Sequence, residues 1–159
     1  MKKTFKISAD VENLPQVIAF IDSNLEAVGC GMKAQTQIEI SVEELFVNIA
    51  HYAYSSAVKA SCNGASDVAQ AANAENSVSE EGNATVTFDF SEETRTVTIS
   101  LIDSGVPYNP LSKPDPDITL SVEERQIGGL GIFMVKKNMD EVMYDFAAGK
   151  NIVTIKKII

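Results

Sequence analysis

The sequence predicts an α+β fold, a two-layer sandwich in which helices cover one face of a mostly antiparallel, mixed sheet. Residues 84–90 and 95–103 are rich in β-branched side chains, and the short polar turn SEET between them indicates an antiparallel hairpin. Residues 141–146 and 151–158 form a second such pair, turned by AAGK. Two segments with helical spacing of apolar residues precede the first hairpin and supply the helical layer.

The chain begins with a predicted strand and helix. Residues 3–8, KTFKIS, alternate apolar and polar side chains as a strand at a sheet edge does. Asp10 stands where the N-cap of the following helix is expected, and Gly29 and Gly31 end that helix. Its apolar residues recur at helical spacing: Leu14, Val17, Ile18, Ile21 and Leu25.

A second helix is predicted from about Ala34 to Ala57. One face of it is apolar and consists of Ile38, Val42, Leu45, Phe46, Ile49 and Ala53. Further along, a polar loop containing prolines is predicted over residues 104–127. The segment GGLGIFMVKKNM, residues 128–139, then predicts a helix that opens on glycines.

Length and composition favour one domain spanning residues 1–159, because 45% of the residues are hydrophobic. The net charge of −9 disfavours binding to nucleic acid or to an anionic membrane surface, since both reward clustered Lys and Arg. Cys30 and Cys62 have no metal-ligand spacing. With no signal peptide and no long apolar run, a cytoplasmic location is expected.

Residues 55–83 do not resemble the interior of a compact domain. They are rich in Ala, Ser, Asn and Glu and contain almost no large apolar residue. A loop of this length without its own structure is uncommon within a domain. We therefore expect a surface insertion that is mobile or, because of its alanines, partly helical, and a partner-binding arm is the alternative interpretation.

The second predicted helix carries a polar stripe opposite its apolar face. Glu44, Asn48 and His51 follow one another along this stripe. The residues that border it are Ile40, Val47 and Tyr54, which favours a partly enclosed space. A carboxylate and an amide one turn apart can take a proton and ligate a hard cation, respectively. The alternative is the solvated side of an amphipathic helix.

Two later motifs also admit two interpretations. Asp103 ends a strand just before a glycine turn, where it stabilises the turn or accepts a hydrogen bond from an amino group in a pocket. Gly128, Gly129 and Gly131 open a helix, where backbone amides and the helix dipole favour phosphate, or where glycine only permits a tight turn. No Lys-Ser/Thr pair follows these glycines, and Met134 occupies the third glycine position of a dinucleotide fingerprint.

Taken in order, EELFVNIAHYAY, DSGVPYNP and IGGLGIFMVKKNMDEVMY resemble the GHKL (histidine kinase-like) ATPase superfamily. Within it, the chain is similar to the anti-sigma-factor serine/threonine-protein kinase family. The resemblance covers nearly the whole chain apart from residues 55–83 and implies a Bergerat-type ATP-binding fold.

The resemblance implies roles for individual residues. Glu44 matches the family's general base, and Asn48 matches the amide that ligates Mg²⁺ bridging the ATP phosphates. Asp103 matches the aspartate that accepts a hydrogen bond from the adenine amino group. Gly105 matches the glycine that shapes the adenine pocket.

The second half of the resemblance concerns the phosphates. Gly129 and Gly131 match the family's second glycine box, whose backbone amides contact the ATP phosphates. The segment at about 110–127 corresponds to the ATP lid, from which Arg125 is expected to reach the γ-phosphate.

Three features depart from the family pattern. The histidine that often stands four residues after the metal-binding asparagine is found three residues after it, at His51, and Tyr52 takes the expected place. This spacing favours His51 as a structural neighbour of the site. Asn109 stands where many relatives have an acidic residue, and the 55–83 insertion has no counterpart in a minimal member.

The resemblance implies an ATP- and Mg²⁺-dependent serine kinase. Its expected substrate is an anti-sigma antagonist (STAS-type) protein, and sequestration of a sigma factor is a second expected role. A nucleotide-gated binding module and a stand-alone ATP hydrolase remain alternatives. The catalytic part of a two-component histidine kinase is disfavoured, because no dimerisation-helix histidine precedes residue 3. Relatives of this kind are often dimers, so a homodimer is a further expectation.

Overall fold

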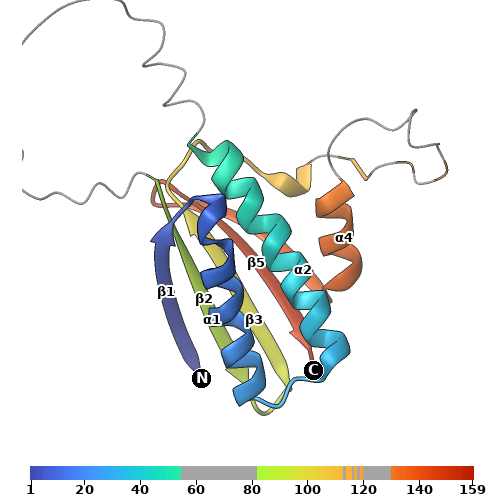
Figure 1. Ribbon diagram of the computed structural model, residues 1–159. Coiled ribbons are helices and arrows are strands. Elements are labelled where there is room, and N and C mark those ends of the chain that lie inside the picture. Colours follow the sequence, from blue (N-terminus) through green and yellow to red (C-terminus); the bar gives the residue numbers. More distant parts are fainter. Residues whose placement is uncertain (55–81, 113, 116, 118, 120–129) are drawn as a thin grey trace, which may run out of the picture.

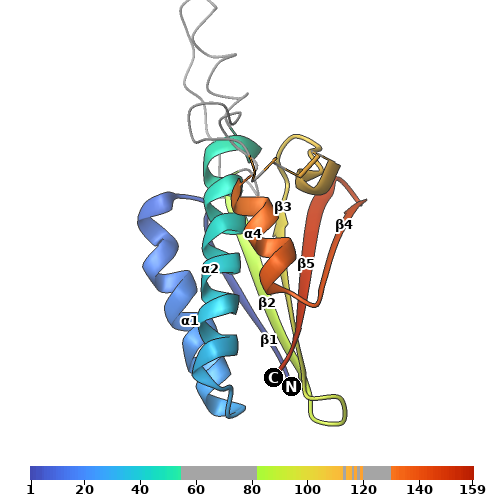
Figure 2. The same cartoon turned by 90° about the vertical axis from the view of Figure 1, so that its right-hand side faces the viewer.

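The structure is a computed structural model in which helices lie on one face of an antiparallel sheet (Figures 1 and 2). It describes residues 1–54, 82–112, 114–115, 117, 119 and 130–159. The strands are β1 (Lys2–Ser8), β2 (Asn83–Ser91), β3 (Thr96–Asp103), β4 (Glu141–Ala147) and β5 (Lys150–Ile158). The α-helices are α1 (Leu14–Ala27), α2 (Met32–Asn48) and α4 (Leu130–Asn138).

The predicted α+β class is confirmed, with strand order β1-β2-β3-β5-β4. Every neighbouring pair of described strands is antiparallel, so the sheet contains no parallel pair in this part of the chain. Strand β1 lies at one edge, as its alternating pattern predicts. Both predicted hairpins are present, and the β4–β5 turn is made by Ala148 and Gly149, which both have positive φ.

The core lies between the sheet and the helices. Alternate residues of β2, β3 and β5 are buried, and they pack against the buried sides of α1 and α2. The predicted apolar face of the second helix is buried in full: Ile38, Val42, Leu45, Phe46, Ile49 and Ala53. The apolar side chains repeat every second residue along the strands and about every 3.6 residues along the helices, so each layer has one apolar face. These two faces pack against each other and are buried together.

The start of the first helix differs from the prediction. The Asp10 side chain accepts a hydrogen bond from the Glu12 backbone amide (3.1 Å), so it caps a short 3-10 turn rather than α1 itself. Helix α1 begins after this turn, with Pro15 in its first turn, where a missing amide hydrogen bond has no cost. It ends at Ala27, and Gly29 then adopts a positive φ of 67°.

The second helix begins at Met32 and ends at Ala53, earlier than predicted. Its last turn, Ile49–Ala53, is a π-helix. The carbonyl of Ala53 accepts a hydrogen bond from the Val106 amide (3.0 Å), which satisfies an acceptor that a helix end leaves open. A Cβ added to Gly105 would lie 2.6 Å from the Ala53 carbonyl carbon. A glycine is therefore required where the exit of β3 meets the end of α2.

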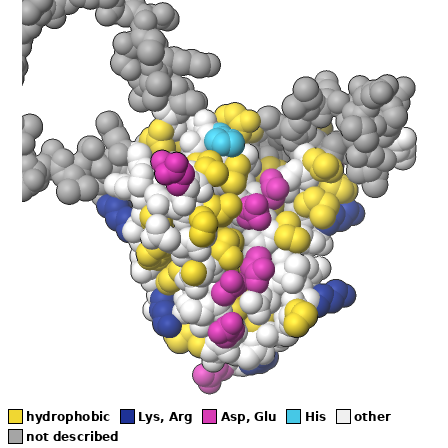
Figure 3. All heavy atoms as spheres, viewed as in Figure 1, with side chains coloured by type: hydrophobic (Ala, Val, Ile, Leu, Met, Phe, Trp, Pro, Cys, Tyr) yellow, Lys and Arg dark blue, Asp and Glu magenta, His cyan; other side chains and the backbone are white. Residues whose placement is uncertain are grey.

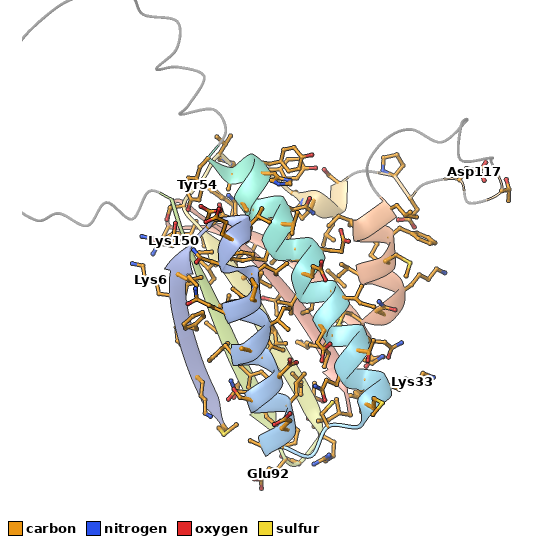
Figure 4. The ribbon with its side chains drawn as sticks, viewed as in Figure 1. Lys6, Lys33, Tyr54, Glu92, Asp117 and Lys150 are labelled. Atoms are coloured by element: carbon orange, nitrogen blue, oxygen red, sulfur yellow. The ribbon has the colours of Figure 1, made fainter. Side chains whose placement is uncertain are left out.

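Tyr54 joins the two sides of the predicted insertion. Its hydroxyl donates to the carbonyl of Asn83 (2.6 Å) and accepts from the amide of Ser104 (3.1 Å). Ala9 also donates to the carbonyl of Gly82 (2.7 Å). Figure 4 places Tyr54 at the corner of the sheet where Lys6 and Lys150 also lie. The described chain therefore leaves and re-enters the fold at one corner. The insertion predicted over residues 55–83 is shorter at its end, because Asn83 already belongs to β2, and residues 55–81 lie outside the described residues.

Replacing residues 55–81 with a short Gly/Ser linker is expected to preserve the fold, because both ends of the segment are anchored at that corner. The midpoint of thermal unfolding should stay within a few degrees of that of the full chain, and nucleotide affinity should be retained. Tyr54→Phe in the full chain is the matched comparison, and it should lower the midpoint by removing the hydrogen bonds to Asn83 and Ser104. A linker variant that shows no cooperative thermal unfolding transition would contradict the expectation that residues 55–81 are dispensable for the fold.

Acidic side chains gather over α1 and α2, while lysines and arginines lie toward the periphery of the same view (Figure 3). Among these acids, burial raises the pKa of Glu39, and a hydrogen bond with the Asp22 carboxyl raises it further. This face lacks the clustered positive charge with which proteins hold nucleic-acid phosphates. None of the described helices is long and apolar enough to cross a membrane.

Candidate nucleotide site

A pocket lies between the end of α2, the end of β3 and the start of β5. Its apolar lining consists of Leu45, Ile49, Ala53, Val106, Pro110 and Val153. Its polar or aromatic lining consists of Asn48, Tyr52, Asp103, Tyr108 and Asn151. A concave, largely apolar site with a few converging polar groups is typical of small-molecule binding.

Asp103 is the buried carboxylate of this pocket, with 6% of its surface exposed. Its Oδ1 atom accepts hydrogen bonds from the Gly105 amide (2.9 Å) and from Nδ2 of Asn151 (3.0 Å). The turn-stabilising interpretation of this residue is thus confirmed. Both hydrogen bonds from the described residues go to Oδ1, so Oδ2 is left as an acceptor for a ligand.

Asn48 and Glu44 lie on α2, one turn apart and half-buried. Asn48 lines the pocket, whereas Glu44 lies beside the first turn of α4. At a rise of about 1.5 Å per residue, the two side chains start roughly 6 Å apart along the helix axis. The pocket, the Asn48 amide and the Glu44 carboxylate therefore lie one after another along a single path that runs from the end of β3 to the start of α4.

Gly131 provides the space in which the Glu44 carboxylate lies. A Cβ added to Gly131 would overlap Oε2 of Glu44 and lie 2.8 Å from its Cδ. The glycine is therefore needed for close packing against Glu44, a requirement that the sequence pattern did not suggest. Gly129 and Arg125, together with Gly128, lie outside the described residues.

Part of the predicted lid is described. Pro110–Ser112 forms a 3-10 turn, and the Asn109 side chain caps it by accepting from the Leu111 amide (2.9 Å). Asp115 forms an ion pair with Lys136 of α4 (2.9 Å). The base of this segment therefore packs beside the pocket, and one later residue contacts α4.

Gly131→Ala is expected to displace the Glu44 carboxylate while leaving the pocket intact. The end of a glutamate side chain can rotate away, so the fold and nucleotide affinity should persist. A misplacement of about 1 Å at a reacting group costs roughly 100-fold in rate, so phosphoryl transfer or ATP hydrolysis should fall by about that factor. Gly31→Ala is the matched control, because nothing lies within 4 Å of a Cβ built there. Equal rates for the two variants would show that the Glu44–Gly131 packing has no catalytic consequence.

His51 does not share the path of Glu44 and Asn48, which corrects the predicted single stripe. It is exposed, whereas Tyr52 lines the pocket and contacts the His51 ring edge-on at 6.1 Å between centroids. The reason is the π-turn, which is wider than an α-helical turn and changes the direction of the side chains after Asn48. The prediction that His51 is a structural neighbour of the site agrees with this position.

Asn151 is a pocket residue that the sequence patterns did not identify. It is 4% exposed, lies on β5, and pairs directly with Asp103 in the sheet register. A signal was present, because an asparagine occupies the first inward position of a strand whose next inward residues are Val153 and Ile155. A buried amide in an apolar series requires hydrogen-bond partners, and Asp103 is one of them.

An α+β sandwich with a buried aspartate at the end of β3 and an asparagine-bearing helix beside it is the architecture expected of an ATP-binding domain of the histidine kinase-like class. The histidine kinase-like ATPase domain family matches residues 7–157, and the chain belongs to this family. Membership implies ATP binding. A search of curated proteins finds no match.

Comparison with solved structures finds the same fold in a crystal structure of the RsbU and RsbW domains of Rv1364c from Mycobacterium tuberculosis. The TM-score is 0.61 at 14% sequence identity, and the match covers 99% of this chain. It covers 32% of the other chain, so this chain spans about a third of the length of that chain. At this identity the comparison shows a shared fold.

Proposed function

We propose that this chain is a cytoplasmic, ATP-dependent serine protein kinase that phosphorylates an anti-sigma antagonist (STAS-type) protein and also sequesters a sigma factor. One observation carries the catalytic part of the proposal: the Glu44 carboxylate lies against the start of α4, one helical turn from the pocket-lining Asn48. The similarity in fold to a chain containing an RsbW domain supports the choice of partners.

The lining of the pocket supports binding of the base of an adenine nucleotide. Its apolar walls suit a purine ring, and Oδ2 of Asp103 is available to accept from the 6-amino group. From there the phosphates would extend toward Asn48 and the first turn of α4, where helix amides favour negative charge. The amide of Gly129 and the side chain of Arg125, from a lid at about 110–127, would complete the phosphate contacts.

The donors present also fit Mg²⁺. The described residues contain no cluster of three His, Cys, Asp or Glu side chains, so the protein's own ligand in this region would be the Asn48 amide oxygen. Such a site suits Mg²⁺, which keeps several waters and takes its remaining ligands from phosphates. When bound with ATP, Mg²⁺ supplies positive charge to the phosphate oxygens.

Glu44 acts as the general base in the proposed reaction. The substrate serine oxygen bonds to the γ-phosphorus as the bond from that phosphorus to the bridging oxygen breaks and ADP leaves. Glu44 accepts the proton of the serine hydroxyl, and Asn48 and the glycines hold the reacting groups in line. General-base assistance of this kind contributes about 10²- to 10⁴-fold in rate.

Incubation with γ-labelled ATP, Mg²⁺ and candidate STAS-type and sigma proteins from the same organism tests the proposal. We expect label on a serine of the STAS-type protein and a stable complex with the sigma factor. A complex with the STAS-type protein but no label would support a nucleotide-gated binding module instead. Free phosphate without labelled protein would support an ATP hydrolase. The predicted homodimer can be measured by light scattering on the same sample.

A further inference from the structure

We propose that Asn151 is a positioning residue that fixes the orientation of the Asp103 carboxylate, so that the pocket selects a 6-amino purine over a 6-oxo purine. The proposal rests on the proposed nucleotide site and adds the residue that determines its base specificity.

The orientation of the Asn151 amide follows from its neighbours. The Tyr108 backbone amide can only donate, and it lies 3.0 Å from the atom assigned as Oδ1. The Val106 carbonyl can only accept, and it lies 3.0 Å from Nδ2. The Tyr144 hydroxyl then donates to Oδ1 (2.7 Å). A flipped amide would place a donor against a donor and an acceptor against an acceptor.

The fixed amide determines what Asp103 presents to the pocket. Nδ2 of Asn151 and the Gly105 amide both donate to Oδ1, so this oxygen is fully engaged on the protein side. Oδ2 accepts neither of these hydrogen bonds and is the carboxylate oxygen available to a ligand. Because Asn151 is 4% exposed and Asp103 is 6% exposed, water has little access with which to relax this arrangement.

Purines with different 6-substituents interact differently with Oδ2 of Asp103. The amino group of adenine donates to Oδ2, whereas the carbonyl of hypoxanthine or guanine brings an acceptor against it. A site built to accept a hydrogen bond rejects an analogue that cannot donate one, because its own polar atom is left unpaired. A hydrogen bond to a charged group is worth roughly 10- to 100-fold in affinity, which is the expected preference for ADP over IDP.

The test measures dissociation constants for ADP and IDP by calorimetry on the full chain. Asn151→Leu removes the donor at similar volume, and Asn151→Asp replaces it with an acceptor at nearly the same shape. Both should weaken ADP binding and reduce the IDP-to-ADP ratio of dissociation constants to within about threefold of unity, because Asp103 loses its fixed orientation. Tyr144→Phe is the matched control: it removes a partner of Asn151 but keeps the bond to Asp103. Its ratio should equal that of the wild type.

Two outcomes would overturn the proposal. One is a wild-type ratio in Asn151→Asp, with thermal unfolding showing that this variant is folded. The other is an equal loss of selectivity in Tyr144→Phe, which would assign the effect to general loosening of the pocket wall. Failure of the wild type to bind ADP at all would instead contradict the proposed function, so the two failures are distinguishable.

Discussion

Glu44→Gln is expected to reduce phosphoryl transfer by about 10²- to 10⁴-fold while leaving the dissociation constant for ADP nearly unchanged. The amide keeps the shape of the side chain beside Gly131 but cannot take a proton. Glu44 is absent from the lining of the pocket, so loss of its charge should act on transfer and spare the binding of the base. Single-turnover transfer of label from ATP to the protein substrate measures the first effect, and calorimetry measures the second.

Glu43→Gln provides the matched control for this experiment. Glu43 is the preceding residue on the same helix and is exposed. Its substitution by glutamine removes the same charge as Glu44→Gln does. It should transfer phosphate at the wild-type rate. Wild-type transfer by Glu44→Gln would exclude Glu44 as the base, and equal losses in both variants would point to a general electrostatic effect of the helix.

Asp103→Asn is expected to weaken ADP binding by roughly 10- to 100-fold and to invert the base preference toward IDP. The oxygen of the substituted amide would take the hydrogen bonds from Gly105 and Asn151, since both partners donate. The amino group would then face the ligand and meet the 6-amino group of adenine as a second donor. With hypoxanthine the same amino group would find an acceptor. Competition against a fluorescent nucleotide measures both affinities in one assay.

Asp145→Asn is the control for this variant, because Asp145 is an exposed aspartate on β4. It should leave both affinities unchanged. An unaltered dissociation constant for ADP in Asp103→Asn would refute the assignment of the adenine amino group to this carboxylate. Weaker binding of both nucleotides by the same factor would indicate that the substitution disturbs the pocket as a whole.

Most of the fold could be predicted because its signals are local. Alternation identified the strands, and the positive-φ turn between β4 and β5 falls in the predicted AAGK segment. Helical periodicity identified α1 and α2. The boundaries were less predictable: Asp10 caps a 3-10 turn, and α2 ends at Ala53 because its final carbonyl is taken by Val106. Such endings depend on contacts between distant segments.

The candidate site was predictable where side-chain chemistry follows a short spacing. The structure brings Asn48 and Asp103 to one pocket, with Gly105 at its edge and Glu44 one turn away beside Gly131.

Three features of the site needed the three-dimensional arrangement. The π-turn separates His51 from the path and brings Tyr52 to the pocket. Strand register places Asn151 opposite Asp103, although 48 positions separate them in the chain. The packing of Gly131 against Glu44 joins two helices that are far apart in the sequence.

A crystal structure of the chain with ADP and Mg²⁺ is the most direct test of the account. We predict the adenine ring between Ile49 and Val153, with its 6-amino group about 3 Å from Oδ2 of Asp103, as a hydrogen bond requires. The metal should contact the Asn48 amide oxygen, and the phosphates should extend toward α4. A nucleotide bound elsewhere, or bound here with its amino group turned away from Asp103, would contradict the account.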